Sequence, residues 1–220
     1  MEKIKELTSK YNHAILLLYL ALYMPWFSWL EAHTPTQNPT PLYCGLDDLI
    51  PFCEWFIIPY YLWFAYIVVG HIFLFFTSRA DFVRMCIFLY TGMTVCLIIY
   101  TLWPNCQELR VDYDTLGRTN ILIEAVASLQ SYDTADNVFP SIHCLNSIGM
   151  HIALAKSKYM GRHRNMIVGA SFILIVLIII STVCLKQHSI LDFFGSLILS
   201  VPLYFLAYKP ELRFLNKKAA

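Results

Sequence analysis

The chain has 220 residues, of which 58% are hydrophobic and only 14% are charged. The mean hydropathy is +0.55. This composition excludes a disordered chain, a collagen and a soluble nucleic-acid binder. The net charge of +1, from 16 Lys and Arg against 15 Asp and Glu, indicates no charged partner by itself. The length fits one domain, which we expect to cover residues 1–220.

Six apolar stretches are long enough, at about 20 residues each, to cross a bilayer. They predict an all-α membrane protein with six transmembrane helices in a single bundle. The fourth stretch is the weakest, because Asn146, Ser147 and His151 interrupt it, and a buried re-entrant segment is the alternative. A signal peptide fits poorly, because no small-residue cleavage site follows the first stretch. The stretches are 13–31, 53–76, 82–103, 137–155, 166–185 and 188–208.

The charged residues divide unevenly between the two sides of such a bundle. The two tails and the turns after the second and fourth stretches hold 13 basic and four acidic residues, or +9. The other side holds three basic residues (Arg110, Arg118 and Lys186) and 11 acidic residues, or −8. The positive-inside rule therefore predicts that both termini are cytoplasmic.

Two loop features complete the organisation of the chain. Residues 117–130 lie in a long outer loop, and their apolar pattern fits an amphipathic helix on the membrane surface. The seven cysteines have neither C-x-x-C nor zinc-site spacing, and we interpret them as small apolar packing residues. A disulfide among Cys44, Cys53 and Cys106 is left open.

Polar residues interrupt the apolar pattern in three segments, 100–110, 137–147 and 181–192. All three lie at outer span ends in the orientation above. The charge count did not require this agreement, so we expect the segments to form one shared site. Ionisable groups within a span are costly and are usually functional.

In the third segment, His188 and Asp192 are four residues apart, which predicts that they share a helical face. A carboxylate beside an imidazole fixes its tautomer and leaves the other ring nitrogen as a nucleophile or base. A purely structural hydrogen bond is the alternative. In the first segment, Arg110 is suited to bidentate phosphate binding, unless it is a solvated loop arginine.

In the second segment, Pro140 suits the first position of a helix. Ser141 and the free amides of Ile142 and His143 would then lie at a helix N-terminus, which attracts phosphate. His143 is placed to protonate a leaving oxygen. Asn146 and Ser147 can face the same pocket. An ordinary capped helix start is the alternative.

Together, the three segments resemble the type 2 phosphatidic acid phosphatase superfamily, which shares its core with the vanadium haloperoxidases. The family motifs are K-x6-R-P, P-S-G-H and S-R-x5-H-x3-D. Here the second reads Pro140-Ser141-Ile142-His143, and the third keeps its spacing from Ser181 to His188 and Asp192. The resemblance implies a haloperoxidase-like core in an integral membrane phosphatase-like domain.

The resemblance also implies the roles of the site residues. His188 would be the nucleophile that forms a phosphohistidine, Asp192 would orient it, and His143 would be the general acid. No metal or other cofactor is implied. The expected phosphate-binding residues are Arg110, Ser141, Ile142, Lys186 and Ser181, with Thr182, Asn146 and Ser147 behind them.

The motifs also depart from the family pattern. Val111 and Trp103 replace the Pro and Lys of the first motif, Ile142 replaces Gly, and Thr182 replaces Arg. Lys186, four residues after Thr182 and hence predicted on the same helical face, would supply part of the lost charge. This variant resembles the branch that includes inositol phosphorylceramide synthases.

We therefore expect a lipid phosphatase that cleaves a lipid phosphate monoester or pyrophosphate at the outer membrane face. The first alternative is a lipid phosphotransferase that moves a head group to a lipid hydroxyl. The second is a non-catalytic lipid-binding or transport protein. The expected partners are a lipid substrate and the bilayer, without nucleic acid, and the expected location is a bacterial plasma membrane. The sequence leaves the oligomeric state open.

Overall fold

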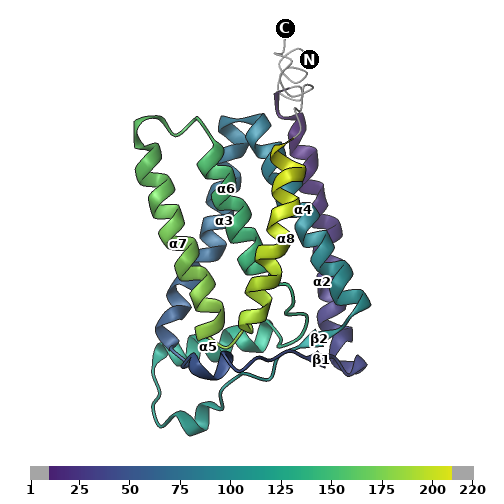
Figure 1. The fold of residues 1–220 in the computed structure, drawn as a ribbon, viewed down its shortest axis with the longest axis vertical. Coiled ribbons are helices and arrows are strands. Elements are labelled where there is room, and N and C mark those ends of the chain that lie inside the picture. Colours follow the sequence, from purple (N-terminus) through teal and green to yellow (C-terminus); the bar gives the residue numbers. More distant parts are fainter. Residues whose placement is uncertain (1–9, 210–220) are drawn as a thin grey trace.

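The computed structural model describes residues 10–209, which form a bundle of long helices with short structured loops gathered at one end (Figure 1). The tail charges used in the orientation argument, within 2–6 and 211–218, lie outside the described residues. The α-helices are α2 (Tyr19–His33), α3 (Ile57–Thr77), α4 (Arg79–Leu102), α5 (Ile121–Tyr132), α6 (Ile142–Lys156), α7 (Arg164–Cys184) and α8 (Ile190–Tyr208).

Short elements extend and connect these helices. Six are 3-10 turns: η1 (Asn12–Leu18), η2 (Thr34–Gln37), η3 (Asp47–Leu49), η4 (Glu54–Phe56), η5 (Tyr113–Leu116) and η6 (Gly161–His163). Two are strands, β1 (Thr40–Pro41) and β2 (Asn105–Cys106), which pair in parallel. This small sheet joins the two long loops that follow α2 and α4.

Five helical stretches are long and apolar enough to cross a membrane. They are Asn12–Gln37, Glu54–Thr77, Arg79–Leu102, Gly161–Cys184 and Ile190–Tyr208, which match five of the six predicted stretches. The remaining predicted stretch, the fourth (137–155), contains α6. The 15 residues of α6 rise about 22 Å, which is less than the roughly 30 Å hydrocarbon core of a bilayer. The count of six crossings and the cytoplasmic termini therefore stay predictions.

Helix α6 lies at the centre of the bundle, although it has only 15 residues. It packs against α3, α4, α7 and α8. Gly149 allows the close approach to α4, because a Cβ at this position would clash with the Phe88 ring. Small residues commonly permit such approach between membrane helices. The start of α6 is thereby fixed relative to the helices that carry the other motifs.

The amphipathic helix predicted at 117–130 is confirmed as α5, which lies across the loop end of the bundle beside the β1–β2 sheet (Figure 1). It begins at Ile121 because the Asn120 side chain accepts hydrogen bonds from the amides of Leu122 and Ile123. The Glu54 carboxylate forms an ion pair with Arg118 at 2.8 Å and accepts a hydrogen bond from the Asn120 side chain at 3.1 Å. These contacts hold the start of α5 against η4.

A buried asparagine in the second long loop positions the start of α6. Asn105 is fully buried, and its Oδ1 accepts the amides of Val138 and Phe139, each at 2.9 Å. The Tyr100 hydroxyl donates to the Pro140 carbonyl at 2.6 Å. Buried backbone groups need such partners in a membrane protein. The first polar segment therefore supports the second.

A buried aspartate in the first long loop similarly positions the start of α8. The carboxylate of Asp47 accepts the Ser189 hydroxyl at 2.7 Å and the Ile190 amide at 2.9 Å. The same carboxylate accepts the Cys44 amide at 3.0 Å, which holds its own loop in place. A negative charge at a helix N-terminus is also favoured by the helix dipole. Asp47 thus caps a helix more than 140 positions away in the sequence.

We predict that Asp47→Ala destabilises the protein by about 1–3 kcal/mol, because three buried donors lose their acceptor. The neighbouring variant Asp48→Ala is the matched control, since Asp48 is exposed and bonds only the Tyr43 hydroxyl. Its effect should stay within about 0.5 kcal/mol. Unfolding of both variants in the same detergent measures the difference. Equal stability of the two variants would contradict this account of the α8 cap.

Candidate active site

The third polar segment forms a tight turn between α7 and α8. Helix α7 ends at Cys184, and Lys186 has a left-handed backbone with a φ of 57°. The amides of Gln187 and His188 both donate to the Thr182 carbonyl. His188 therefore precedes α8, and the expectation that it shares one helix with Asp192 is wrong.

His188 and Asp192 nevertheless meet, through the cap of α8. Asp192 Oδ2 accepts His188 Nδ1 at 3.0 Å and the amide of Ser189, the N-cap residue, at 3.0 Å. This reciprocal capping arrangement fixes the carboxylate, which is completely buried. Because Nδ1 is held by a carboxylate, the His188 Nε2 atom is left with a lone pair in the neutral ring.

His143 lies in the first turn of α6 and approaches His188. The two ring centroids are 5.7 Å apart. His143 Nε2 lies 3.0 Å from the Tyr60 hydroxyl, and the Trp63 ring packs against the imidazole at 4.4 Å between centroids. The second and third polar segments therefore lie together, as expected, whereas their role in one shared site stays a prediction.

Both histidines line a cavity of about 310 Å³ at the end of the bundle where the long loops gather. Ile142 and Gln187 also line it, so the starts of α6 and α8 both face this space. Three acidic residues, Glu31, Asp133 and Asp136, contribute to the wall. Among residues 10–209, no lysine or arginine lines the cavity.

A hydrogen-bonded chain that the sequence analysis missed connects His143 to the loop after α5. The Tyr60 hydroxyl donates to Asp133 Oδ2 at 2.8 Å, so its oxygen is free to accept from His143 Nε2. Gln187 Nε2 donates to the same Asp133 oxygen at 3.0 Å. A tyrosine in an apolar span and a glutamine next to His188 were the available signals, but neither residue belongs to a family motif.

Arg110 lies behind this chain and does not line the cavity. Its guanidinium donates to the Gln130 carbonyl at 2.8 Å, to the Asp133 carbonyl and to Gln187 Oε1 at 3.0 Å. Burial lowers the pKa of Arg110, and the nearby Asp133 carboxylate opposes that shift. In this arrangement, Gln187 stands between the arginine and the cavity.

Lys186 is the clearest departure from expectation. The predicted shared helical face with Thr182 is wrong, because α7 ends before Lys186 and the chain turns there. Its ammonium donates to the Asp47 carbonyl at 2.8 Å and to the Ile50 carbonyl at 2.6 Å. The charge is therefore directed into the first long loop, away from the cavity.

The hydroxyl residues of the motifs are buried and satisfy backbone groups. Ser141 caps α6 by accepting the Cys144 amide and does not line the cavity, whereas the next residue, Ile142, does. Ser181 and Thr182 donate to the carbonyls of Ile178 and Ile179 within α7. In the described geometry, these three side chains position the turns that carry the histidines.

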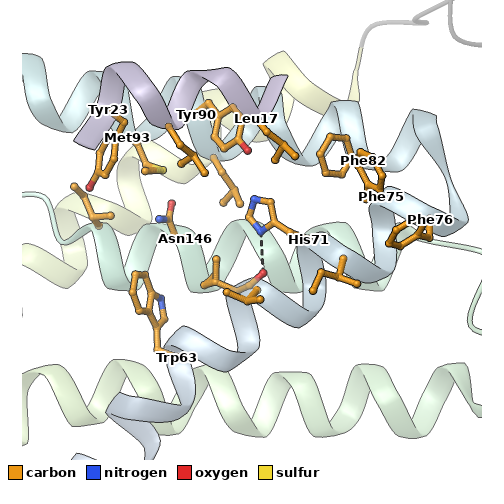
Figure 2. A pocket seen from close by; sticks show the side chains of 16 residues that line it. Leu17, Tyr23, Trp63, His71, Phe75, Phe76, Phe82, Tyr90, Met93 and Asn146 are labelled. Carbon is orange, nitrogen blue, oxygen red and sulfur yellow. Dashed lines mark hydrogen bonds between the residues drawn. The ribbon is translucent and has the colours of Figure 1, made fainter. Parts of the chain in front are cut away.

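A second, apolar cavity of about 390 Å³ adjoins the first, and the two share Tyr23, Trp63 and Ile142 (Figure 2). Asn146, expected near the phosphate site, lines this second cavity instead. His71 Nδ1 lies 2.8 Å from the Ile67 carbonyl, and its ring points into the space (Figure 2). Ser147 faces neither cavity and donates to the His143 carbonyl at 2.7 Å.

The cysteines and acidic clusters provide no metal centre in the part of the chain that the structure describes. All seven cysteines are free, so the alternative of a disulfide among Cys44, Cys53 and Cys106 does not occur in this structure.

Comparison with known proteins addresses the resemblance directly. Residues 111–212 match the family model described as the PAP2 superfamily. Neither the curated proteins nor the solved structures give a match to the chain. The matched segment contains His143, His188 and Asp192 and begins one residue after Arg110. The finer resemblance to inositol phosphorylceramide synthases stays a prediction. The resemblance to the type 2 phosphatidic acid phosphatase superfamily is confirmed, with residues 111–212 as the segment that carries it.

Proposed function

We propose that the chain is a membrane enzyme that transfers the phosphoryl group of a lipid, with or without its head group, through a phosphohistidine. The observation that carries this proposal is the pairing of His188 with buried Asp192 while His188 and His143 line one cavity. A nucleophile whose second nitrogen is held by a carboxylate, facing a second proton-transfer group, is the arrangement that covalent catalysis requires.

The proposed reaction has two steps with balanced atoms. The lone pair of His188 Nε2 attacks phosphorus, the bond from phosphorus to the lipid oxygen breaks, and His143 gives its proton to that oxygen. An acceptor hydroxyl then attacks the phosphohistidine, His143 takes the acceptor's proton, and the P–N bond breaks to restore His188. Asp192 stabilises the positive charge that His188 develops in both steps.

The adjoining apolar cavity supports a lipid as the substrate. It extends from Trp63 and Ile142, at the edge of the histidine cavity, to Phe75, Phe76 and Phe82 near the opposite end of α3 (Figure 2). An apolar space of this kind buries hydrocarbon favourably, and its opening beside the histidines would align a chain with its phosphate. We propose that one hydrocarbon chain of the substrate occupies it.

Water is the acceptor in the first candidate reaction, which releases phosphate from a monoester or pyrophosphate. A lipid hydroxyl is the acceptor in the second, which moves a phospho-head group from a diester donor. The charge of the cavity favours the second candidate, because a phosphate dianion would meet carboxylates without a lining cation. A diester phosphate carries a single charge and is repelled less.

We predict that His188→Ala abolishes turnover, with a loss of more than about 10³-fold, because the covalent step has no substitute. Protein incubated with lipid labelled at phosphorus and quenched in alkali should retain label only when His188 is present. His33→Ala is the matched control, since His33 is exposed and bonds only the Trp29 carbonyl. Full activity of His188→Ala would instead favour a non-catalytic lipid binder or transporter.

We further predict that Tyr60→Phe lowers kcat about 10- to 100-fold with a lipid substrate, because Asp133 no longer supports the protonated form of His143. A substrate with a p-nitrophenol leaving group needs no protonation, so the loss with it should be much smaller. Tyr61→Phe is the control, since the Tyr61 hydroxyl only donates to the Ala125 carbonyl. An equal loss with both substrates would show that Tyr60 acts on stability alone.

A further inference from the structure

The charge of the histidine cavity is unusual for a site that handles phosphate. Glu31, Asp133 and Asp136 line it, and within residues 10–209 none of them forms an ion pair. The two nearby cations are directed elsewhere, since Arg110 donates to backbone carbonyls and Gln187, and Lys186 donates to the Asp47–Ile50 loop. The cavity wall therefore presents negative charge only.

The three carboxylates differ in how many hydrogen bonds they accept from the protein. Asp133 accepts both Tyr60 and Gln187 and belongs to the His143 chain. Glu31 accepts the amide and hydroxyl of Thr134 through Oε2, and the Asn137 side chain also lies within hydrogen-bonding reach of its carboxylate. The Asp136 carboxylate accepts no hydrogen bond from residues 10–209, and burial raises its pKa. Glu31 and Asp136 thus keep free acceptor capacity.

A second observation is a ring nitrogen without a partner in residues 10–209 that faces the same cavity. His188 is only 7% exposed, its Nδ1 is held by Asp192, and its Nε2 has no partner among the described residues. The residue nonetheless lines the cavity. Because this free nitrogen and the carboxylates line one cavity, the cavity is suited to a ligand that carries both an electrophilic phosphorus and a positive charge.

Aromatic rings complete the wall and are compatible with a cation. Trp63 and Phe64 of α3 line the cavity, with ring centroids 4.9 Å apart, and Phe27 of α2 and Tyr132 of α5 line it as well. The faces of such rings attract ammonium groups, and most strongly where water is excluded.

We propose that the donor lipid is a phosphodiester whose head group carries an ammonium ion, held by Glu31, Asp136 and the aromatic wall. This inference rests on the proposed function, because it assigns the substrate class of the same site. The ammonium neutralises the carboxylates, and the diester phosphate, with one negative charge, lies beside the histidines.

The reaction balances as follows. His188 Nε2 bonds to phosphorus, the bond from phosphorus to the diacylglycerol oxygen breaks, and His143 protonates that oxygen. Diacylglycerol leaves, and the amino-alcohol phosphate stays on His188. The oxygen of water or of a lipid hydroxyl then bonds to phosphorus, the P–N bond to His188 breaks, and His143 takes the acceptor's proton, so the amino-alcohol phosphate is transferred to the acceptor and the free histidine is restored.

The test uses the full chain in proteoliposomes with four lipids of identical acyl chains: phosphatidylethanolamine, phosphatidylcholine, phosphatidylglycerol and phosphatidate. A long-chain alcohol is added as a lipid acceptor. Release of diacylglycerol and of free phosphate are both measured. We expect kcat/KM to be at least about fivefold higher for the two ammonium lipids than for phosphatidylglycerol.

The double variant Glu31→Gln with Asp136→Asn should lower kcat/KM for the two ammonium lipids by about five- to thirtyfold, mainly through a higher KM, and so remove the preference over phosphatidylglycerol. Gln at position 31 keeps an acceptor for Thr134, which protects the fold. Glu108→Gln is the control, because Glu108 is an exposed acidic residue of the same loop end that does not line the cavity. It should leave the preference unchanged.

The outcomes separate this inference from the proposed function. Turnover of phosphatidate alone, or equal turnover of ammonium lipids and phosphatidylglycerol, would overturn the ammonium site and leave phosphoryl transfer standing. A preference that survives the double variant would also overturn the site. No reaction with any lipid, together with no labelled His188, would overturn both proposals.

Discussion

The carboxylate of Asp192 is the group on which the rest of the site depends. A single oxygen accepts both the Nδ1 proton of His188 and the amide that opens α8, so one charge caps a helix and orients a histidine. Both roles depend on the same oxygen of a completely buried residue, so removal of that carboxylate leaves the Ser189 amide and His188 Nδ1 without their partner. The start of α8 and the orientation of His188 are therefore one structural unit.

The two long loops, after α2 and after α4, act as a second layer around that unit. Asp47 caps α8 from the first loop, and Asn105 holds the chain that leads into α6. Gln107 and Gln130 donate to the carbonyls of Lys186 and Leu185, which secures the turn before His188. Every one of these side chains satisfies a backbone group that would otherwise be orphaned in a dry environment. The loops therefore do more than connect the helices, because they hold the turns that carry His143 and His188.

The sequence was sufficient for five of the long helices, because apolar length is a local property. It also predicted the approach of His143 to His188, because both lie at span ends on the same side of the bundle. It failed where position depends on a turn. Lys186 was placed by helical periodicity, but α7 ends at Cys184 and the ammonium is turned toward Asp47. Tyr60 and Asp133 were missed because their pairing joins residues 73 positions apart, which no single-sequence pattern reveals.

Helix α2 provides a wall of both cavities yet is weakly embedded in the bundle, with only Tyr23 and Leu30 of its residues buried. Many of its other apolar side chains are exposed on the outside, where lipid is their natural neighbour. The surrounding bilayer is thus a structural component of the cavity walls. Extraction into detergent replaces that component, so the shape of both cavities in the purified protein depends on the amphiphile that surrounds α2.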